Sequence, residues 1–438
     1  MTKQGQRNID VNDIILPPDY LIDVFAKDLT TPINLTFTDE GDMLIADAGV
    51  TDGNGKVLRL HHKHFEVIAD GFNPPLTGIT YHQGLIYVAH RGIVTVILSN
   101  GTKKNIIEGL PSWGDHHNNR VVFGTDGKMY FGQGTATNSG VVGQDNQEWV
   151  RKYPFFHDYP GSTIQLIGQN FLTENFLTAS SNDSTNTGAY SPFGVPASPG
   201  EVVQGILRAS GSIISANPDG SDLQLVAWGL RNPFRIRFDR HNRLFSTNHG
   251  MDVRGSRSVA NSPDEFYEVS NGLWYGWPDF TGGQPVTSPY FKPVNEPQPQ
   301  FILAKHPMVP PKPLATFAPH SAIMGFDFNR NPRFGSPDLV FIAEYGSEAP
   351  ETTGGIPMPG VGHRVSWFDI KVGQVYPFAM NKSGFAASYT GGGGLERPID
   401  AVFGPDDSLY IADFNYTVNG GPDEFTPGTG VIWRITKQ

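Results

Sequence analysis

The sequence of 438 residues contains no cysteine, so disulfide bonds and thiolate metal sites are excluded. It also lacks any run of about twenty apolar residues that could cross a membrane. The first residues, MTKQGQRNIDVNDI, hold no apolar run of signal-peptide length. We therefore expect either a cytoplasmic protein, or a periplasmic or secreted one whose leader has been removed and replaced by a start codon.

Positive charge is scarce as well. The chain has 32 Lys and Arg against 43 Asp and Glu, which gives a net charge of −11 and a pI of about 5.6. A field of this sign opposes binding to nucleic acid and to anionic membranes. The sequence therefore predicts no nucleic-acid partner, no membrane insertion and a small neutral molecule as the ligand.

No long stretch repeats an apolar face at helical spacing, whereas turn-forming residues are abundant. Gly occurs 51 times, Pro 35 times, and aromatic residues make up 12% of the chain. Many short strands joined by turns have this composition. We expect one large all-β domain over residues 17–438, preceded by an N-terminal extension over residues 1–16.

One hairpin pattern recurs along this domain. Its form is apolar-x-apolar, then a turn with Asp or His before Gly, then apolar-x-apolar. The first two steps between copies are 43 and 44 residues, about the length of a four-stranded propeller blade. Later steps are longer because loops are inserted. The six copies begin at Pro32, Pro75, Asn119, Asn232, Ser321 and Arg397.

The two ends of the chain each carry a strand without a local partner. One is DYLIDVFAKDL, which begins at Asp19, and the other is GVIWRITK, Gly430 to Lys437. Pairing Leu21–Phe25 with Val431–Ile435 would close the ring and remove its free edges. The sequence therefore predicts an all-β, six-bladed β-propeller in which the terminal strands complete one blade.

Two long insertions interrupt the repeats. Residues 136–205 are rich in Asn, Ser, Thr, Gly and aromatic residues, and residues 347–362 read SEAPETTGGIPMPGVG. Loops of such length are commonly binding loops or lids. Surface decoration is an equally good interpretation of both.

Charged and polar residues flank the hairpins at one end of the expected ring. Arginines that converge on a funnel suit an anionic ligand, and an imidazole among them suits a general base. The simpler interpretation is that His116 and His117 satisfy turn carbonyls, that Arg120 bonds a loop carbonyl, and that Arg231 and Asn232 are turn residues. The residues at this end are Asp115, His116, His117, Arg120, Arg231, Asn232, His249, Gly250, Met251, His320, Glu344, Arg364, Arg397 and Asp400.

Four segments carry a family resemblance: GLRNPFRIRF, HGM followed by DEFYEV, GLWYGWPDF, and DHHNNRVVFGTDGKMYFGQG. Together they resemble the soluble quinoprotein sugar dehydrogenases of the glucose and sorbosone dehydrogenase superfamily. Members of that family are six-bladed propellers that bind pyrroloquinoline quinone and calcium. The resemblance extends over most of the chain from about Pro17, and it implies an external electron acceptor.

The resemblance implies roles for individual residues. His116, in the pattern Asp-His-x-x-x-Arg, matches the catalytic base, and Arg231 and Asn232 match cofactor contacts. The backbone carbonyls of Gly250 and Met251 match the calcium ligands, and carbonyl oxygens suit that ion. On this basis the metal polarises the quinone carbonyl and the cofactor supplies the redox chemistry.

Some positions depart from the family pattern. Gly134-Thr135 stands where the glucose-oxidising members have Gly-Asp, whose carboxylate supports the base. The paired arginines of the sixth blade are reduced to Arg397, with Ile399 in the second position. The cofactor-binding Lys of the fifth blade has no match beside Arg364. We expect Arg364 and Arg397 to contact the cofactor, and we expect glucose itself to be a poor substrate.

Three functions compete. The first is oxidation of a sugar, a sugar aldehyde or a polyol by the quinone. The second is a calcium-dependent lactonase-type hydrolase, which would hold its metal with carboxylates and Asn. The third is a propeller without activity that binds a glycan or a protein partner. The sequence favours the first, because His116, Arg231 and Arg397 suit an anionic quinone better than a metal bound by carboxylates.

Overall fold

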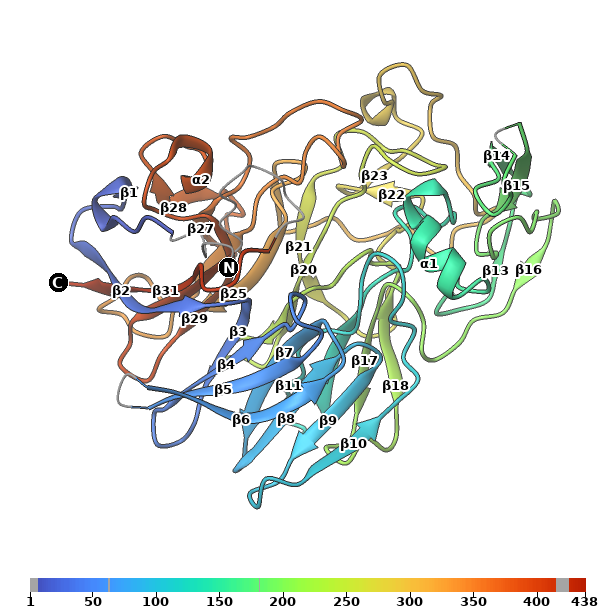
Figure 1. Cartoon of the computed structure of the whole chain (residues 1–438). Helices are drawn as coiled ribbons and strands as arrows, with labels where there is room; N and C mark the ends of the chain where they lie inside the picture. Colours follow the sequence, from blue (N-terminus) through green and yellow to red (C-terminus); the bar gives the residue numbers. More distant parts are fainter. Residues whose placement is uncertain (1–6, 62–63, 181, 415–424) are drawn as a thin grey trace.

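The computed structural model describes residues 7–61, 64–180, 182–414 and 425–438. Within these residues, six antiparallel sheets of four or five strands follow one another in chain order, from blue to red in Figure 1. The first strand of each sheet lies nearest the centre of the ring, where neighbouring first strands such as β3 and β7 contact each other. The chain therefore forms the six-bladed β-propeller that its repeats predict.

The blades are built as follows. Blade one contains β3 (Pro32–Phe37), β4 (Met43–Asp47), β5 (Gly55–His61) and β6 (His64–Phe72). Blade two contains β7 (Leu76–His82), β8 (Leu85–His90), β9 (Ile93–Ile97) and β10 (Lys103–Ile107). Blade three contains β11 (Val122–Phe123), β12 (Met129–Gln133), β17 (Ser212–Ala216) and β18 (Gln224–Trp228). Blade four contains β19 (Ile236–Phe238), β20 (Leu244–Asn248), β21 (Asp264–Val269) and β24 (Ala315–Phe317).

The last two blades take strands from both ends of the chain. Blade five contains β25 (Ile323–Phe328), β26 (Leu339–Glu344), β27 (Arg364–Asp369) and β28 (Tyr376–Asn381), and β1 (Ile14–Ile15) adds a fifth strand. Blade six contains β29 (Arg397–Phe403), β30 (Leu409–Phe414), β31 (Gly430–Lys437) and, at its outer edge, β2 (Tyr20–Leu29).

The closure of the ring in blade six is as predicted. In the antiparallel pair of β2 and β31, Ile22 lies opposite Ile435 and Val24 lies opposite Trp433. Trp433 is fully buried, so the C-terminal strand contributes to the core and not only to the edge. The N-terminal strand β2 and the C-terminal strand β31 therefore belong to the same blade, which closes the ring.

The Asp-x-Gly hairpins fold for local reasons. In the turn before β12, the Asp126 carboxylate accepts a hydrogen bond from the Lys128 amide, at 3.1 Å, and Gly127 adopts a φ of 78°. An Asp side chain that bonds its own backbone two residues on, followed by a glycine at positive φ, is a turn that alternating apolar residues extend into a hairpin. The repeat was visible in the sequence because these signals are local.

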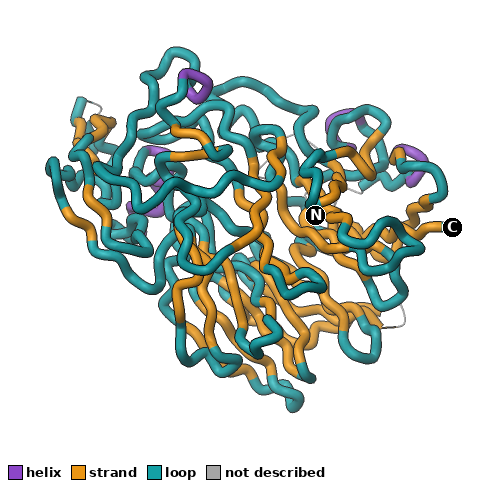
Figure 2. The backbone as a smooth tube through the Cα atoms, turned by 180° about the vertical axis from the view of Figure 1, so that it is seen from behind, coloured by secondary structure: helices purple, strands orange, loops and turns teal. Residues whose placement is uncertain are grey.

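Long loops cover one end of the ring. Figure 2 shows from behind that strands dominate one side of the molecule, whereas loops and the short helices gather on the other. Among the described residues, no helix has the length and apolarity to cross a bilayer. The helices are α1 (Gln147–Lys152), α2 (Ala387–Thr390) and the 3-10 turns η1 (Val11–Asp13), η2 (Gln144–Asn146) and η3 (Pro289–Phe291).

The predicted insertion of residues 136–205 lies in blade three between β12 and β17, and it packs against a third insertion that the sequence analysis missed. That segment, residues 270–314, lies in blade four between β21 and β24. The Ile167 amide donates to the Ile302 carbonyl, at 3.0 Å, and the two insertions share an apolar core. Their strand pairs are β13 (Ile164–Gln165) with β16 (Val202–Val203), β14 (Asn170–Glu174) with β15 (Ser184–Gly188), and β22 (Phe280–Thr281) with β23 (Gln284–Pro285).

Candidate active site

A cavity of about 450 Å³ lies at the loop-covered end of the central channel. Its walls come from the residues before the first strands of blades four and five, from the loop before β11, and from the loop that follows β26. Seven of the residues that the sequence places at this end line it together: Asp115, His116, Arg231, Asn232, His249, Gly250 and His320. The other charged residues that line it are Asp252, Arg254, Asp264, Glu348 and Glu351.

His116 is held in one orientation by the strand beside it. Its Nδ1 lies 3.1 Å from the Thr135 carbonyl oxygen and 3.3 Å from the Thr135 hydroxyl, which itself donates to the Thr137 carbonyl. Since the carbonyl oxygen can only accept, His116 Nδ1 carries the proton and Nε2 is left unprotonated. Thr135 therefore orients the imidazole in the way that the missing carboxylate of the family pattern was expected to do.

Gly134 creates the space for this imidazole. A Cβ at residue 134 would lie only 2.3 Å from His116 Cβ and 2.9 Å from the Asn232 side-chain oxygen. Real atoms do not approach so closely, so glycine is needed to let the His116 loop pack on β12.

The surroundings of His116 keep it neutral. Burial is the main cause that lowers its pKa well below 6.5, and the charges of Arg231 and Arg254 lower the pKa further. An imidazole that stays unprotonated at neutral pH can accept a proton.

His117 does not share this position. It is absent from the cavity wall and packs beside Trp149, with 6.2 Å between the ring centroids. Neighbouring residues of an extended segment point to opposite sides, which accounts for the difference.

Arg231 and Asn232 are fixed by the hairpin that they begin. The Asn248 side-chain oxygen, at the end of β20, accepts hydrogen bonds from both their backbone amides at 2.9 and 3.0 Å. The antiparallel pairing of β19 and β20 brings these two chain segments together. The Asn232 side chain also lies 3.1 Å from His249 Nδ1, whose ring donates from Nε2 to the Ile323 carbonyl.

A charged network that the sequence analysis missed surrounds Arg231. The Asp252 carboxylate lies 2.8 Å from Arg231, 3.1 Å from Arg254 and 3.3 Å from His320. Burial alone would raise the pKa of Asp252, but Arg231 and the other cations outweigh it and hold the pKa well below its usual range. Asp252 therefore stays ionised, and its position directly after His249-Gly250-Met251 was the signal that could have identified it.

Gly250 and Met251 present two carbonyl oxygens in a tight backbone turn. The Gly250 amide donates to Asp264 and the Met251 amide donates to the Ser262 hydroxyl, both at 2.7 Å. Within the described part of the chain, neither carbonyl oxygen accepts a hydrogen bond. A Cβ at residue 250 would lie 2.5 Å from the Ser262 carbonyl oxygen, so the turn requires glycine.

The remaining predicted site residues lie outside this cavity. Met251 is almost fully buried, and its side chain packs in the core shared by the insertions. Arg364 pairs with the buried Glu344 carboxylate at 3.0 Å. Arg397 donates to the Gly346 and Ser347 carbonyls at 3.3 Å and lies over the Tyr345 ring, 4.8 Å from its centroid.

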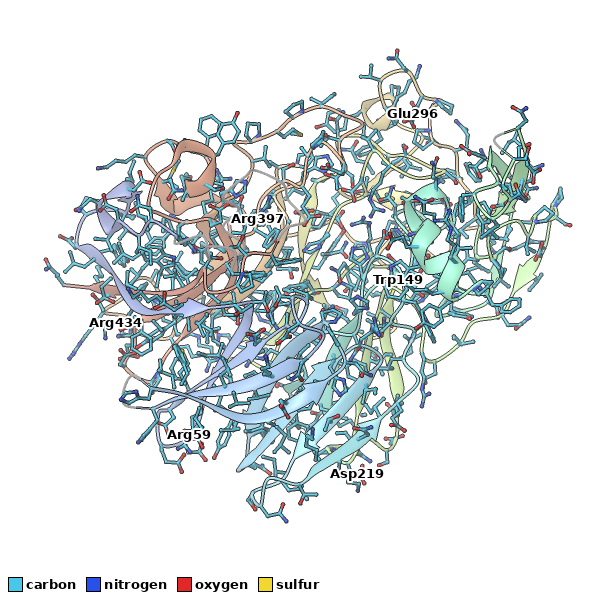
Figure 3. The ribbon with its side chains drawn as sticks, viewed as in Figure 1. Arg59, Trp149, Asp219, Glu296, Arg397 and Arg434 are labelled. Atoms are coloured by element: carbon cyan, nitrogen blue, oxygen red, sulfur yellow. The ribbon has the colours of Figure 1, made fainter. Side chains whose placement is uncertain are left out.

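Arg397 thus supports the loop after β26 that forms one wall of the cavity. Figure 3 shows Arg397 within the ring, whereas Arg59 and Arg434 lie at its outer edge. In the structure, Arg364 and Arg397 contact protein groups behind the wall, while Arg231 belongs to the wall itself.

The cavity carries an excess of negative charge. Five carboxylates and two guanidiniums line it, so its net charge is −3 with neutral histidines. No group of three or more His, Asp or Glu side chains in the described residues is arranged to hold a metal ion. Two of the five carboxylates are instead paired with arginines: Asp115 with Arg254 at 2.5 Å and Asp252 with Arg231 at 2.8 Å.

The chain forms a β-propeller with a polar pocket at one end of its channel, and several solved structures share the propeller fold. The holo form of the pyranose dehydrogenase PQQ domain from Coprinopsis cinerea is similar with a TM-score of 0.58 and 13% identity over 99% of this chain and 98% of that one. The calcium structure of a Trichoderma reesei enzyme of carbohydrate-active enzyme family AA12 is similar with a TM-score of 0.55 and 14% identity over 100% of both chains.

A third similar structure is an oxidoreductase of the glucose dehydrogenase type from Thermus thermophilus, with a TM-score of 0.55 and 15% identity over 95% of this chain and 100% of that one. No protein-family model matches the sequence, and comparison with curated proteins gives no match. The propeller fold is therefore shared with glucose dehydrogenase-like quinoproteins, which agrees with the resemblance noted in the sequence.

Proposed function

We propose that this protein is an oxidoreductase that oxidises a sugar, a sugar aldehyde or a polyol, with pyrroloquinoline quinone as the cofactor and calcium as the metal. The observation that carries the proposal is the His116 imidazole, whose Nδ1 donates to Thr135 and whose Nε2 is unprotonated in a cavity with Arg231 and Asn232. The likeness to solved structures supports the fold of such an enzyme.

In the proposed reaction a substrate carbinol loses a hydride from carbon and a proton from its hydroxyl. His116 Nε2 accepts the hydroxyl proton and becomes imidazolium, while Thr135 holds the opposite nitrogen in place. Pyrroloquinoline quinone would supply the two-electron acceptor, and calcium would polarise its carbonyl. An external electron acceptor would be needed to complete the reaction cycle.

Calcium fits the turn at Gly250 and Met251. Their two carbonyl oxygens accept no hydrogen bonds from the described residues, and such oxygens are the ligands that Ca²⁺ prefers. Two ligands are too few for tight binding alone, because Ca²⁺ takes six to eight oxygens. The metal and the cofactor would therefore bind together.

The charge of the cavity also supports joint binding of the metal and the cofactor. The three-unit excess of carboxylates over guanidiniums opposes entry of an anionic cofactor without a cation. A divalent ion that enters with the cofactor offsets this repulsion. Arg231 and Arg254 are the side chains in the wall that would face the carboxylates of the cofactor.

The experiment that tests the proposal adds the quinone to the purified protein with calcium, with magnesium, or with a chelator. We expect a change in the quinone absorbance and dye reduction by one or more of a panel of aldoses, sugar aldehydes and polyols, both only with calcium. Absence of a spectral change together with absence of dye reduction would contradict the proposal. A spectral change without activity on any substrate would support binding of the cofactor and contradict oxidation of the sugars, sugar aldehydes and polyols tested.

A further inference from the structure

Three arginine side chains converge in the central channel, away from the cavity that holds His116. Arg235 and Arg237 flank Ile236 at the beginning of β19, and Arg120 lies two residues before β11. Arg235 and Arg120 are 0% and 6% exposed. Guanidinium groups are rarely buried unless ion pairs or hydrogen bonds compensate them, so the partners of these three decide what the cluster can do.

The available partners leave several nitrogen atoms unsatisfied. Arg120 donates from Nε to the Thr80 hydroxyl at 3.0 Å, but its Nη1 has no partner. Arg120 therefore does not bond the loop carbonyl expected from the sequence, because its side chain donates to threonine hydroxyls of blades one and two. Arg237 donates from Nε to the Phe326 carbonyl and its Nη1 lies 3.2 Å from Asp327, but its Nη2 has no partner.

Arg235 is the least satisfied of the three. None of its three guanidinium nitrogens has a hydrogen-bond partner within the described residues, and the nearest carboxylate oxygen, Asp400 Oδ1, lies 3.6 Å from its Nε. Burial, together with the charges of Arg237 and Arg235, lowers the pKa of Arg120 to about 9. The three cations therefore repel one another in a region that water does not screen.

The neighbouring carboxylates take up only some of the remaining donors, although Asp400 Oδ1 has no hydrogen-bond partner among the described residues. Asp400 Oδ2 accepts from the Asn34 side chain at 2.6 Å and from the Leu35 amide at 2.9 Å. Asp327 accepts from the Phe328 and Phe403 amides at 2.8 and 3.0 Å. These two acidic residues tie strands of blades one, five and six together, so most of their acceptor capacity is used by the backbone.

A second cavity, of about 230 Å³, lies beside the cluster at the opposite end of the channel. It is formed at the C-terminal ends of the first strands, where Phe37 ends β3 and Phe403 ends β29, whereas the cavity of His116 lies at their N-terminal ends. Cofactor sites commonly have about 300 to 1,000 Å³, so this space is too small for one. Its charged lining residues are Arg120, Arg237, Asp327, Arg330 and Asp407.

We propose that this second cavity binds a small inorganic anion, a halide or a tetrahedral oxyanion, which receives hydrogen bonds from the guanidinium groups of Arg120 and Arg237. Arg235 does not line the cavity and contributes only its positive charge. Because Arg120 Nη1 and Arg237 Nη2 are covered, their end groups must turn toward the cavity when the anion binds. Water could satisfy the donors, but an anion also offsets the positive charge that Asp327 and Asp400 leave uncompensated among the three cations.

The bound anion would link residues of three blades. Arg120 belongs to blade three, Arg237 to blade four and Arg330 to the loop after β25 of blade five. A ligand that binds only the folded protein stabilises it by mass action. The proposal therefore predicts stability that depends on the anion, and it does not depend on the proposed oxidoreductase activity.

The test measures thermal unfolding against increasing bromide, sulfate or phosphate at constant ionic strength, for the wild type, Arg120→Gln and Arg59→Gln. Arg59 pairs with Asp42 at the outer edge of blade one, so its substitution changes the same charge far from the channel (Figure 3). We expect a saturable rise in Tm for the wild type and for Arg59→Gln. Arg120→Gln should weaken the apparent dissociation constant about tenfold or more, as the loss of a charge-assisted hydrogen bond implies.

Sulfate also stabilises proteins without binding, so only the saturable difference between the variants counts. Equal responses in all three proteins would overturn the proposal and indicate water alone in the cavity. If Arg120→Gln does not fold, Arg237→Gln takes its place. Crystals of the wild type soaked in bromide give a result that needs no variant: anomalous density beside Arg120 supports the site, and its absence there overturns the proposal.

Discussion

The two ends of the central channel use arginine in opposite ways. At the end that holds His116, each guanidinium in the cavity wall is paired with carboxylates: Arg231 with Asp252, and Arg254 with Asp115, Asp145 and Asp252. At the other end, Arg120, Arg235 and Arg237 retain donors without partners. Both ends are built from the same repeated strand, so the difference comes from the residues that flank it.

This difference indicates what each end can accept. Where arginines are already neutralised, an anionic ligand must compete with Asp252 or bring a cation with it, as the calcium of the proposed function would. Where guanidinium nitrogens have no hydrogen-bond partner, a small anion can bind without an accompanying metal. The following predictions test this contrast, beginning with the largest expected effect.

The largest effect is expected from His116→Ala. Loss of a general base typically costs about a hundred- to ten-thousand-fold in rate. We expect a loss of that size in quinone-dependent dye reduction, with unchanged folding and with quinone binding detected by absorbance. His117→Ala is the matched control, because His117 packs beside Trp149 and does not line the cavity. Equal losses in the two variants, or a loss in His117→Ala alone, would contradict the assignment of the base.

The next effect is expected from Asp252→Asn, which removes a carboxylate from Arg231 and so makes the end that holds His116 resemble the opposite end of the channel. Removal of one partner of a buried ion pair costs about 3 to 5 kcal/mol of unfolding free energy, measured here by urea denaturation. At the same time, quinone affinity should rise, because Arg231 no longer has a competing carboxylate. Asp145→Asn is the control, since Arg254 keeps two other carboxylates.

The pH dependence of this variant has a definite sign. The folded-state pKa of Asp252 is depressed, so its contribution to stability is complete above the unfolded value of about 3.9 and disappears as the pH falls through the folded value. The difference between wild type and Asp252→Asn should therefore be constant near neutral pH. A difference that shrinks between pH 8 and pH 5 would contradict the ion pairs described for Asp252.

The features of the fold that depend on neighbouring residues in the sequence could be predicted. The Asp-x-Gly turns and the alternation of apolar residues are local, and the closure of the ring by Leu21–Phe25 and Val431–Ile435 follows from two strands that lack local partners. The third insertion could not be predicted, because residues 270–314 are ordered by contacts with the distant segment around Leu166, such as its bridge to Leu303.

The difference between local and long-range contacts also explains which residues of the candidate site could be predicted. His116, Arg231, Asn232 and Gly250 were found because each belongs to a recognisable motif, and all four line one cavity. The contacts of Arg254 with Asp115 and of Asp252 with His320 join different blades and leave no periodic signal. The burial of Arg235 also leaves no signal in the sequence, because it depends on the neighbouring blades that cover both faces of a first strand.

A smaller effect is expected at Thr135, which holds the imidazole of His116. Thr135→Val removes the hydroxyl and keeps the carbonyl, so kcat/KM should fall by no more than about threefold. Because the pKa of His116 is lowered, activity in both proteins should persist as the pH falls through 6.5. Thr135→Asp places a carboxylate beside Nδ1, favours the imidazolium, and should move the acid limb of the pH profile upward by about one unit. An unchanged limb in Thr135→Asp would contradict the contact between Thr135 and His116.

The smallest effect is expected from Arg330→Gln at the second cavity. Arg330 is exposed at the second cavity, so its charge is screened by solvent and salt. We expect the apparent dissociation constant for sulfate, taken from the saturable rise in Tm, to weaken by less than about threefold, against about tenfold or more for Arg120→Gln. The difference in dissociation constant between Arg330→Gln and the wild type should vanish as ionic strength is raised, because salt screens a surface charge. The weaker sulfate binding of Arg120→Gln should remain. If Arg330→Gln weakened sulfate as much as Arg120→Gln, surface charge and not the buried donors would be responsible for binding, and the contrast between the two ends of the channel would no longer hold.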